Sequence, residues 1–505
     1  MQGTVDLLVI GGGINGAGIA RDASGRGLSV ALVEAGDLGG ATSSASTKLI
    51  HGGLRYLEFY QFGLVRKALA EREVLLDIAP HLSWPQPFVL PVTADRPEWQ
   101  LRAALFLYDH LAKRRTVPGS ERIDLRQERS GRSLDARYTR AYRYWDGWVD
   151  DARLVVANVR DAADRGAVVR TRTRITEARY DGERWLATLG DGTELSARYL
   201  VNAAGPWAEQ VARSVLGRND APGLRLVQGS HIVTRRVHLG RDAFMLQQPD
   251  GRIIFVIPYE HDFSLIGTTE HAIDAPAAVA VTDAETDYLL GAVNRFLTRP
   301  LTHADIVYRY AGVRPLVLEA GKGERETSRD YTLVEHAGVP ALTVVGGKIT
   351  TYRVLAEAVL KRIAPASQPW TATAPLPGGD IERQNGETGQ AAFARWLANL
   401  TAEYANYDPQ LVKRLARTLG SAAEPLLAGG LGDNLGGLFE AELDYFTTRE
   451  WATTADDVLW RRTKQGLHID AAAKARVAAW FGEAAPAPGP NDSAPTHRFA
   501  TPGTV

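Results

Sequence analysis

Three glycines near the start of the sequence have a spacing that serves one kind of chemistry. Gly11, Gly13 and Gly16 form the pattern G-x-G-x-x-G, and Glu34 follows Gly16 by 18 positions. Glycines so spaced allow a tight turn whose backbone approaches a pyrophosphate, and an acid at this distance accepts hydrogen bonds from ribose hydroxyls. The pattern therefore predicts a dinucleotide site.

A second segment, residues 41–57, bears on whether the dinucleotide is FAD or NAD. Its small hydroxyl residues suit the phosphate and ring path of a flavin, and cations lie close to them. Taken alone, the same residues could also form a serine-rich solvated loop. We expect a flavin here, bound by Thr42, Ser43, Ser44, Lys48, Leu49 and His51 and, in later glycine turns, by Gly205, Gly347, Lys348 and Thr350.

Strands and helices must hold these residues in place. Residues 5–10 form an apolar run that ends at the glycines, residues 14–27 are compatible with a helix, and residues 29–34 form a second apolar run. Strand, helix and strand make one βαβ unit, which is the beginning of a Rossmann-type domain. The middle of the chain mixes helical and strand-like stretches, so the fold class is α/β.

Composition excludes several classes of protein. Among the 505 residues, 45% are hydrophobic and 23% are charged, which is typical of globular proteins. The 58 Lys and Arg against 59 Asp and Glu give a net charge of -1, so no global positive field would hold a nucleic acid. The chain has no cysteine, and its 11 histidines show no metal-ligand spacing. Redox chemistry would therefore need a bound organic cofactor.

The pattern changes at the Pro/Gly cluster near residue 375. We expect a flavin domain over 1–375, with interleaved substrate-binding segments at about 80–150 and 210–320. Helix-like segments follow over 376–483 and predict a C-terminal helical domain. Residues 484–505 contain five prolines and few large apolar groups, which predicts a flexible tail.

Membrane contact, if it occurs, is expected to be peripheral. The N-terminus has no signal-peptide pattern, which predicts a cytoplasmic protein, and no apolar run reaches the roughly 18 residues of a spanning helix. The segment 99–116 ends in a basic cluster and could lie on an anionic membrane surface or pack as an ordinary amphipathic helix. Its apolar stripe consists of Leu101, Ala104, Leu105, Tyr108 and Leu111.

Motifs along almost the whole chain resemble those of the FAD-dependent glycerol-3-phosphate dehydrogenases. The motifs are GGGINGAGIARDASGRGLSV, TSSASTKLIHGGLRYLE, WVDDARLV, GSHIV, FVIPY, IGTTE, GVRPL, SRDYTL, GGKITTYRVLAE and DDVLWRRTKQGL. The resemblance implies a Rossmann-type FAD-binding domain with an interleaved mixed-sheet substrate domain, as in glutathione reductase and D-amino-acid oxidase, plus a C-terminal all-α domain. It also implies oxidation of sn-glycerol 3-phosphate to dihydroxyacetone phosphate, with electrons passing to membrane quinone. A homodimer at the inner face of the cytoplasmic membrane is implied as well.

The same resemblance implies roles for residues that would be ambiguous by themselves. Arg314 and Arg329 match the phosphate-binding arginines, although a lone arginine is more often a surface ion pair. His231 matches a substrate-site histidine of the family and is therefore the expected base for the hydroxyl proton, although its position alone favours a structural histidine. Lys348 is the alternative base and a cation beside the flavin or substrate. Further substrate contacts are expected from Arg55, Tyr56 and Thr269.

Two other readings of the sequence stay open. A soluble oxidase of the same family would pass electrons to oxygen and release hydrogen peroxide. A flavin-binding protein without turnover would keep the glycines and Glu34 but not the substrate cations. In the C-terminal region the basic and aromatic residues Trp460, Arg461, Arg462 and Lys464 could cap the active site, form a subunit contact or be a solvated helix end.

Overall fold

The N-terminal strand, glycine turn and helix form as the sequence predicts. The computed structural model describes residues 4–94, 96–220, 223–276, 279–317 and 330–484. Its first sheet is built around the parallel strands β10, β1 and β2, whose Val, Leu and Ile side chains are almost all buried. In sheet order the strands are β17 (Thr332–Glu335), β18 (Ala341–Val345), β10 (Glu194–Asn202), β1 (Thr4–Ile10), β2 (Val30–Val33) and β7 (Val168–Arg170).

Helices and a hairpin cover the two faces of this sheet. One face packs against α1 (Ile14–Gly25), α4 (Asp151–Asp164) and α7 (Tyr352–Ile363) in a single apolar cluster. A Cβ on Gly18 would lie 2.6 Å from the Tyr352 ring, so a glycine is needed where α1 crosses α7. The other face packs against the hairpin β8 (Ile175–Tyr180) and β9 (Trp185–Leu189) and the helix α5 (Ala208–Ser214).

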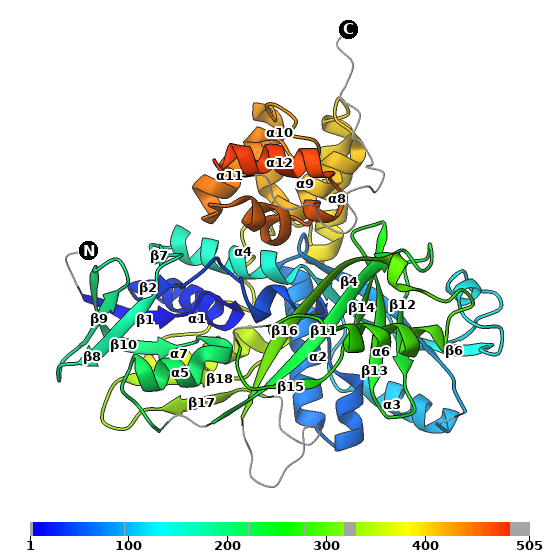
Figure 1. Cartoon of the computed structure of the whole chain (residues 1–505), viewed down its shortest axis with the longest axis horizontal. Coiled ribbons are helices and arrows are strands. Elements are labelled where there is room, and N and C mark those ends of the chain that lie inside the picture. The colour runs from blue at the N-terminus through cyan, green and yellow to red at the C-terminus, as the bar shows by residue number, and fades with distance from the viewer. Residues whose placement is uncertain (1–3, 95, 221–222, 277–278, 318–329, 485–505) are drawn as a thin grey trace.

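A second, mixed sheet lies beside the first (Figure 1). In order its strands are β15 (His271–Ile273), β11 (Leu224–Arg235), β14 (Phe263–Gly267), β13 (Ile253–Tyr259), β12 (Ala243–Gln247), β4 (Ser83–Pro91), β6 (Arg140–Val149) and β3 (Leu49–Ile50), with β16 (Ile306–Val317) on β11 and β5 (Glu121–Asp124) on β6. The helix α6 (Asp283–Asn294) covers one face. The helices α2 (Phe62–Ile78) and α3 (Glu98–His110) cover part of the other, and the rest of that face lines a cavity.

The structure decides between the two roles predicted for the apolar stripe on residues 99–116, because the stripe packs on the core and does not face a membrane surface. Leu105 and Tyr108 are buried against the second sheet, and the remaining stripe residues are partly buried in the same cluster. The stripe packs on the core because the aliphatic and aromatic side chains of the sheet need a cover. The large apolar residues that α3 exposes are Trp99 and Phe106, which are seven residues apart and lie on the side of the helix opposite the stripe.

The C-terminal helices have an apolar cluster of their own, built around residues such as Phe393, Leu415 and Phe446. These helices are α8 (Gly389–Glu403), α9 (Pro409–Leu419), α10 (Ala423–Gly429), α11 (Glu440–Glu450) and α12 (Ala471–Trp480). They lie above α4 in Figure 1. The tail predicted for 484–505 lies outside the described residues except for its first residue. Among the described helices none is both long and apolar enough to cross a bilayer.

Candidate active site

The glycine turn after β1 is shaped by contacts that only glycine allows. Gly11 has φ +106°, and a Cβ there would lie 2.6 Å from the Ala203 carbonyl oxygen. A Cβ on Gly16 would lie 1.9 Å from the Gly11 oxygen. The Glu34 carboxylate accepts hydrogen bonds from the N–H of Gly12 at 2.6 Å and of Gly36 at 2.7 Å. The turn thus presents the start of α1, with its N–H groups and positive dipole end, beside an acid.

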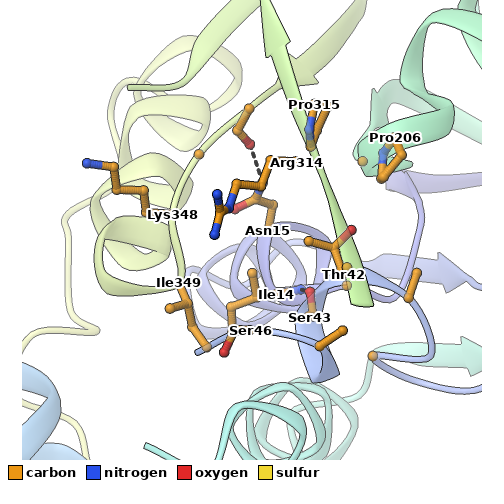
Figure 2. A pocket seen from close by; sticks show the side chains of 18 of the residues that line it. Ile14, Asn15, Thr42, Ser43, Ser46, Pro206, Arg314, Pro315, Lys348 and Ile349 are labelled. Carbon is orange, nitrogen blue, oxygen red and sulfur yellow. Dashed lines mark hydrogen bonds between the residues drawn. The ribbon is translucent and has the colours of Figure 1, made fainter. Parts of the chain in front are cut away.

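A cavity of about 1140 Å³ begins at this turn and reaches the second sheet. Figure 2 shows that segments far apart in the sequence surround it. The Arg314 side chain points toward the start of α1, at Ile14 and Asn15, and toward the segment that contains Ser43. The Ser43 hydroxyl accepts the Ile14 N–H at 3.0 Å, and the Asn15 side-chain amide donates to the Gly346 carbonyl at 3.0 Å. The cavity is larger than the about 300–1000 Å³ of ordinary small-ligand pockets, so it has room for a dinucleotide together with a small substrate.

Strand register brings a histidine and an arginine to the same wall of this cavity. β11 and β16 pair antiparallel, with His231 opposite Tyr310 and Val227 opposite Arg314. Residues directly opposite each other share a face, and so do residues four apart on one strand. His231 and Arg314 therefore both face the cavity, and both line it.

His231 is held as a neutral imidazole. It is 1% exposed, its Nε2 lies 2.9 Å from the Thr47 hydroxyl oxygen, and its ring stacks on Tyr310 at a centroid distance of 4.8 Å. Burial, together with the charges of Arg314 and Lys48, holds the pKa of His231 well below its usual 6.5. The side chain is therefore unprotonated at neutral pH, and a neutral imidazole has one ring nitrogen with a free lone pair for a proton.

Two cations, Arg314 and Lys348, line the cavity. Arg314 Nη2 donates to the Thr268 hydroxyl at 3.1 Å, and Nη1 lies 3.8 Å from Glu270 Oε1, while about a third of the side chain stays exposed. Lys348 Nζ lies 3.9 Å from the centroid of the Tyr56 ring. A guanidinium and an ammonium in the lining of a cavity are cations that suit a phosphate group.

Comparison with known proteins decides the family. A model of FAD-dependent oxidoreductases matches residues 6–353, and a model of the C-terminal domain of alpha-glycerophosphate oxidase matches residues 369–484. The chain belongs to the FAD-dependent oxidoreductase family. The predicted fold class and cofactor are thereby confirmed.

Its relatives are similar over nearly their whole length. The chain is 46% identical over 502 residues to the aerobic glycerol-3-phosphate dehydrogenase of Escherichia coli (strain K12), covering 95% of this chain and 98% of that protein. It is also 46% identical over 501 residues to the D-erythritol 1-phosphate dehydrogenase of Brucella abortus (strain 2308), covering 95% and 98%. The structure of the FAD complex of glycerol-3-phosphate dehydrogenase from Bacillus halodurans matches with a TM-score of 0.72 and 29% identity, over 92% of this chain and 86% of that one. The resemblance to glycerol-3-phosphate dehydrogenases is confirmed.

The cavity of this oxidoreductase fits FAD by its own chemistry. Glu34 and the start of α1 suit the ribose and the pyrophosphate, and the hydroxyl-rich segment 42–47 continues the wall toward the second sheet. The predicted residues that line the cavity are Gly11, Gly13, Glu34, Thr42, Ser43, Leu49, His51, Arg55, Tyr56, Gly205, His231, Arg314, Gly347, Lys348 and Thr350.

Several other predicted residues lie outside the cavity lining. Gly16 packs α1 against the turn, and the Ser44 hydroxyl donates to the Ala41 carbonyl at 3.3 Å. The Lys48 ammonium lies 2.8 Å from Asp151 and 5.1 Å from the centroid of the Tyr310 ring, and it can be buried because that carboxylate compensates its charge. Thr269 is buried and donates to Glu285 at 2.9 Å.

The neighbour of Thr269, Thr268, faces the cavity in its place. Successive side chains on an extended chain point to opposite sides, so a shift of one residue changes which hydroxyl reaches the cavity. Arg329 lies outside the described residues.

The structure also adds residues that the sequence reasoning missed. Thr47 hydrogen-bonds His231, and its place in the run of small hydroxyl residues was an available signal. Arg172 and Asp146 line the cavity without any local motif that would single them out. Arg461 is different, because the sequence already offers it as a cap of the active site, and it lines the cavity from the C-terminal helices. Its neighbour Arg462 is fully buried, which corrects the alternative of a solvated helix end.

Proposed function

We propose that this flavoenzyme oxidises sn-glycerol 3-phosphate to dihydroxyacetone phosphate. The observation that carries the proposal is that His231 and Arg314 lie on one wall of the cofactor cavity. This reaction needs both a base and a phosphate-binding cation. The names of the similar proteins support a phosphorylated polyol as the substrate. FAD, when bound, supplies the acceptor for the hydride that leaves C2.

The side chains then have separate tasks. Arg314 and Lys348 bind the phosphate and so hold C2 in a fixed position relative to His231. Arg329 belongs to the same proposed set. His231 accepts the hydroxyl proton as the C–H bond breaks, so the alcohol loses one hydride and one proton and becomes a ketone. The phosphate dianion stabilises the imidazolium that forms, which partly offsets the effect of Arg314 and Lys48 on this histidine.

We further propose that the electrons pass to quinone and that the protein attaches to the inner face of the cytoplasmic membrane. Phe59 lines the cavity and is 37% exposed, and the neighbouring Tyr60 and Phe62 are 80% and 39% exposed. A lipid-soluble acceptor entering the cavity would pass such an aromatic surface. A crevice lies between α2, which begins at Phe62, and the end of α3. It is lined by Arg66, Lys113, Arg114 and residues near them, and these cations suit anionic lipid headgroups.

The substrate is tested by mixing the purified holoenzyme anaerobically with sn-glycerol 3-phosphate or with D-erythritol 1-phosphate. We expect sn-glycerol 3-phosphate to bleach the flavin at the lower concentration. Preferential bleaching by D-erythritol 1-phosphate would replace the proposed substrate, and no bleaching by either would refute the polyol-phosphate assignment.

The acceptor is tested on the bleached enzyme by adding a short-chain quinone or oxygen. We expect the quinone to restore the flavin absorbance much faster, whereas faster recovery with oxygen would favour the oxidase. Attachment is tested by flotation with anionic vesicles, where Tyr60→Ser is expected to weaken binding. Leu239→Ser is the control, because Leu239 is an 88% exposed residue between β11 and β12. Equal binding by both variants would contradict the proposed surface.

A further inference from the structure

The C-terminal helices reach the cofactor cavity at its adenosine end. Arg461 and Asp456 line the cavity that Glu34 also lines. Arg461 belongs to a π-helical turn, Asp457–Arg462, which lies between α11 and α12. A part of the fold that shares no strand with the Rossmann-type sheet therefore contributes to the wall around the cofactor.

Two arginines of this turn hold a carboxylate that follows β2. Arg462 Nη1 and Nη2 donate to the two oxygens of Asp37 at 2.6 and 2.7 Å, and Arg461 Nε donates to Asp37 at 2.5 Å. The Arg462 side chain is 0% exposed, and it also donates to the Glu450 carbonyl at 2.6 Å. Charged groups buried this deeply are retained only in a well-formed geometry, so the position of Asp37 is tightly specified.

A second link fixes the other side of the same segment. Asp457 accepts from Arg461 at 2.6 Å and from Arg172 at 2.8 Å. The backbone N–H of Arg172 donates to the Gly36 carbonyl at 2.9 Å, and the Arg172 side chain lines the cavity. Arg461 joins Asp37 to Asp457 by hydrogen bonds, and Arg172 adds a longer ion pair to Asp37 at 3.9 Å.

The segment held in this way is the one that shapes the nucleotide site. Gly36 donates to the Glu34 carboxylate, and the Gly39 N–H donates to the Gly12 carbonyl at 3.0 Å. A shift of Asp37 would therefore move the acid for the ribose and the turn for the pyrophosphate together.

We propose that the C-terminal helical domain completes the FAD site. Arg461 is a positioning residue that, through Asp37 and Asp457, holds residues 34–39 and Arg172 around the adenosine half of the cofactor. Retention of FAD thus depends on contacts from this domain. The proposal rests on the cofactor and not on the identity of the substrate.

The test is the rate of FAD release from Arg461→Met, followed by the rise in fluorescence when the diluted holoenzyme frees its flavin. Arg462 still compensates Asp37 and Arg172 still compensates Asp457 in this variant, so we expect it to fold. Release is expected to be roughly tenfold faster, because residues 34–39 and Arg172 lose the hydrogen bonds through which Arg461 holds Asp37 and Asp457. Arg461→Lys should restore part of the slow release.

The matched control is Arg449→Met. Arg449 also joins the C-terminal helices to α4, through Asp164 at 3.5 Å, but it is 55% exposed and does not line the cavity. Melting temperatures of apo and holo forms complete the test, because a positioning role lowers the stabilisation by FAD while a merely structural role lowers both melting temperatures equally. The proposal would be overturned if Arg461→Met released FAD at the wild-type rate, or if Arg449→Met released FAD as fast as Arg461→Met. It would also be overturned if FAD stabilised Arg461→Met as much as it stabilises the wild type.

Discussion

Replacement of His231 by asparagine tests the proposed base. The imidazole is anchored by Thr47 and by stacking on Tyr310, and an asparagine amide keeps a partner for the Thr47 hydroxyl. Even an ordinary pKa of about 6.5 leaves roughly three quarters of imidazoles neutral at pH 7, and the pKa of His231 is lower because of burial, Arg314 and Lys48. Almost the whole population of the enzyme therefore holds the base in its competent form.

The size of the effect follows from what a general base contributes. Loss of such a group costs about 10²–10⁴ in rate, or about 2.7–5.5 kcal/mol in activation free energy. We expect this loss in the rate of anaerobic flavin bleaching by sn-glycerol 3-phosphate, measured by stopped flow. The substrate concentration for half-maximal rate should change little, since Arg314 is untouched.

Thr47→Val provides the comparison, because it removes a single hydrogen bond to the ring and leaves the base in place. It should cost only about fivefold, from a net hydrogen-bond contribution of about 1 kcal/mol. Bleaching by His231→Asn within about threefold of wild type would refute the assignment at the scale expected for general-base catalysis. A large loss of the bleaching rate at saturating substrate in Lys348→Met alone would then identify the lysine as the base, because loss of phosphate binding alone would be overcome by saturation.

Three further variants probe the phosphate site, the glycine turn and the pH dependence. Arg314→Lys should raise KM for sn-glycerol 3-phosphate about tenfold, because the guanidinium fork is lost, while the poor turnover of unphosphorylated glycerol should not change; an equal loss for both alcohols would contradict phosphate binding. Gly16→Ala should lower the flavin absorbance per protein after purification, since its Cβ would lie 1.9 Å from the Gly11 oxygen, whereas Gly291→Ala, which has no atom within 4 Å of its Cβ, should keep full flavin content. His81→Gln should weaken the acid sensitivity of stability: burial and the charges of Arg153 and Arg417 lower the pKa of His81 to about 3, so below pH 6.5 the unfolded chain takes up a proton that the folded chain does not. This histidine should cost about 2 kcal/mol of unfolding free energy between pH 8 and pH 5, and an unchanged difference between urea titrations at those pH values would contradict its burial as a neutral group.

The parts of the fold that the sequence predicts are those set by local pattern. The strand at 5–10, the glycine turn and Glu34 lie within one βαβ unit, so their spacing alone places them. The apolar stripe at 99–116 has helical periodicity but does not identify the surface that covers it, because a helix on a membrane and a helix on a sheet both need one apolar face.

The site depends on pairings that local pattern does not contain. Arg314 shares a wall with His231 only through the register of two strands that lie about 80 positions apart, and the resemblance to a known family is what brought both residues forward. Lys48 is a cation near the flavin segment in sequence, but Asp151, 103 positions away, determines where its charge lies. Arg462 belongs to a charge run that favours solvent exposure, and it is buried because Asp37, 425 positions away, meets it.

The central claim is that a phosphorylated alcohol bound at Arg314 transfers the hydrogen on C2 to the flavin. It is tested most directly by anaerobic single turnover of the holoenzyme with sn-glycerol 3-phosphate carrying deuterium at C2. The account predicts one dihydroxyacetone phosphate for each flavin bleached, with bleaching severalfold slower than for the unlabelled substrate and no slowing for deuterium at C1 or C3. Bleaching without dihydroxyacetone phosphate, or no flavin reduction by this substrate at all, would contradict it.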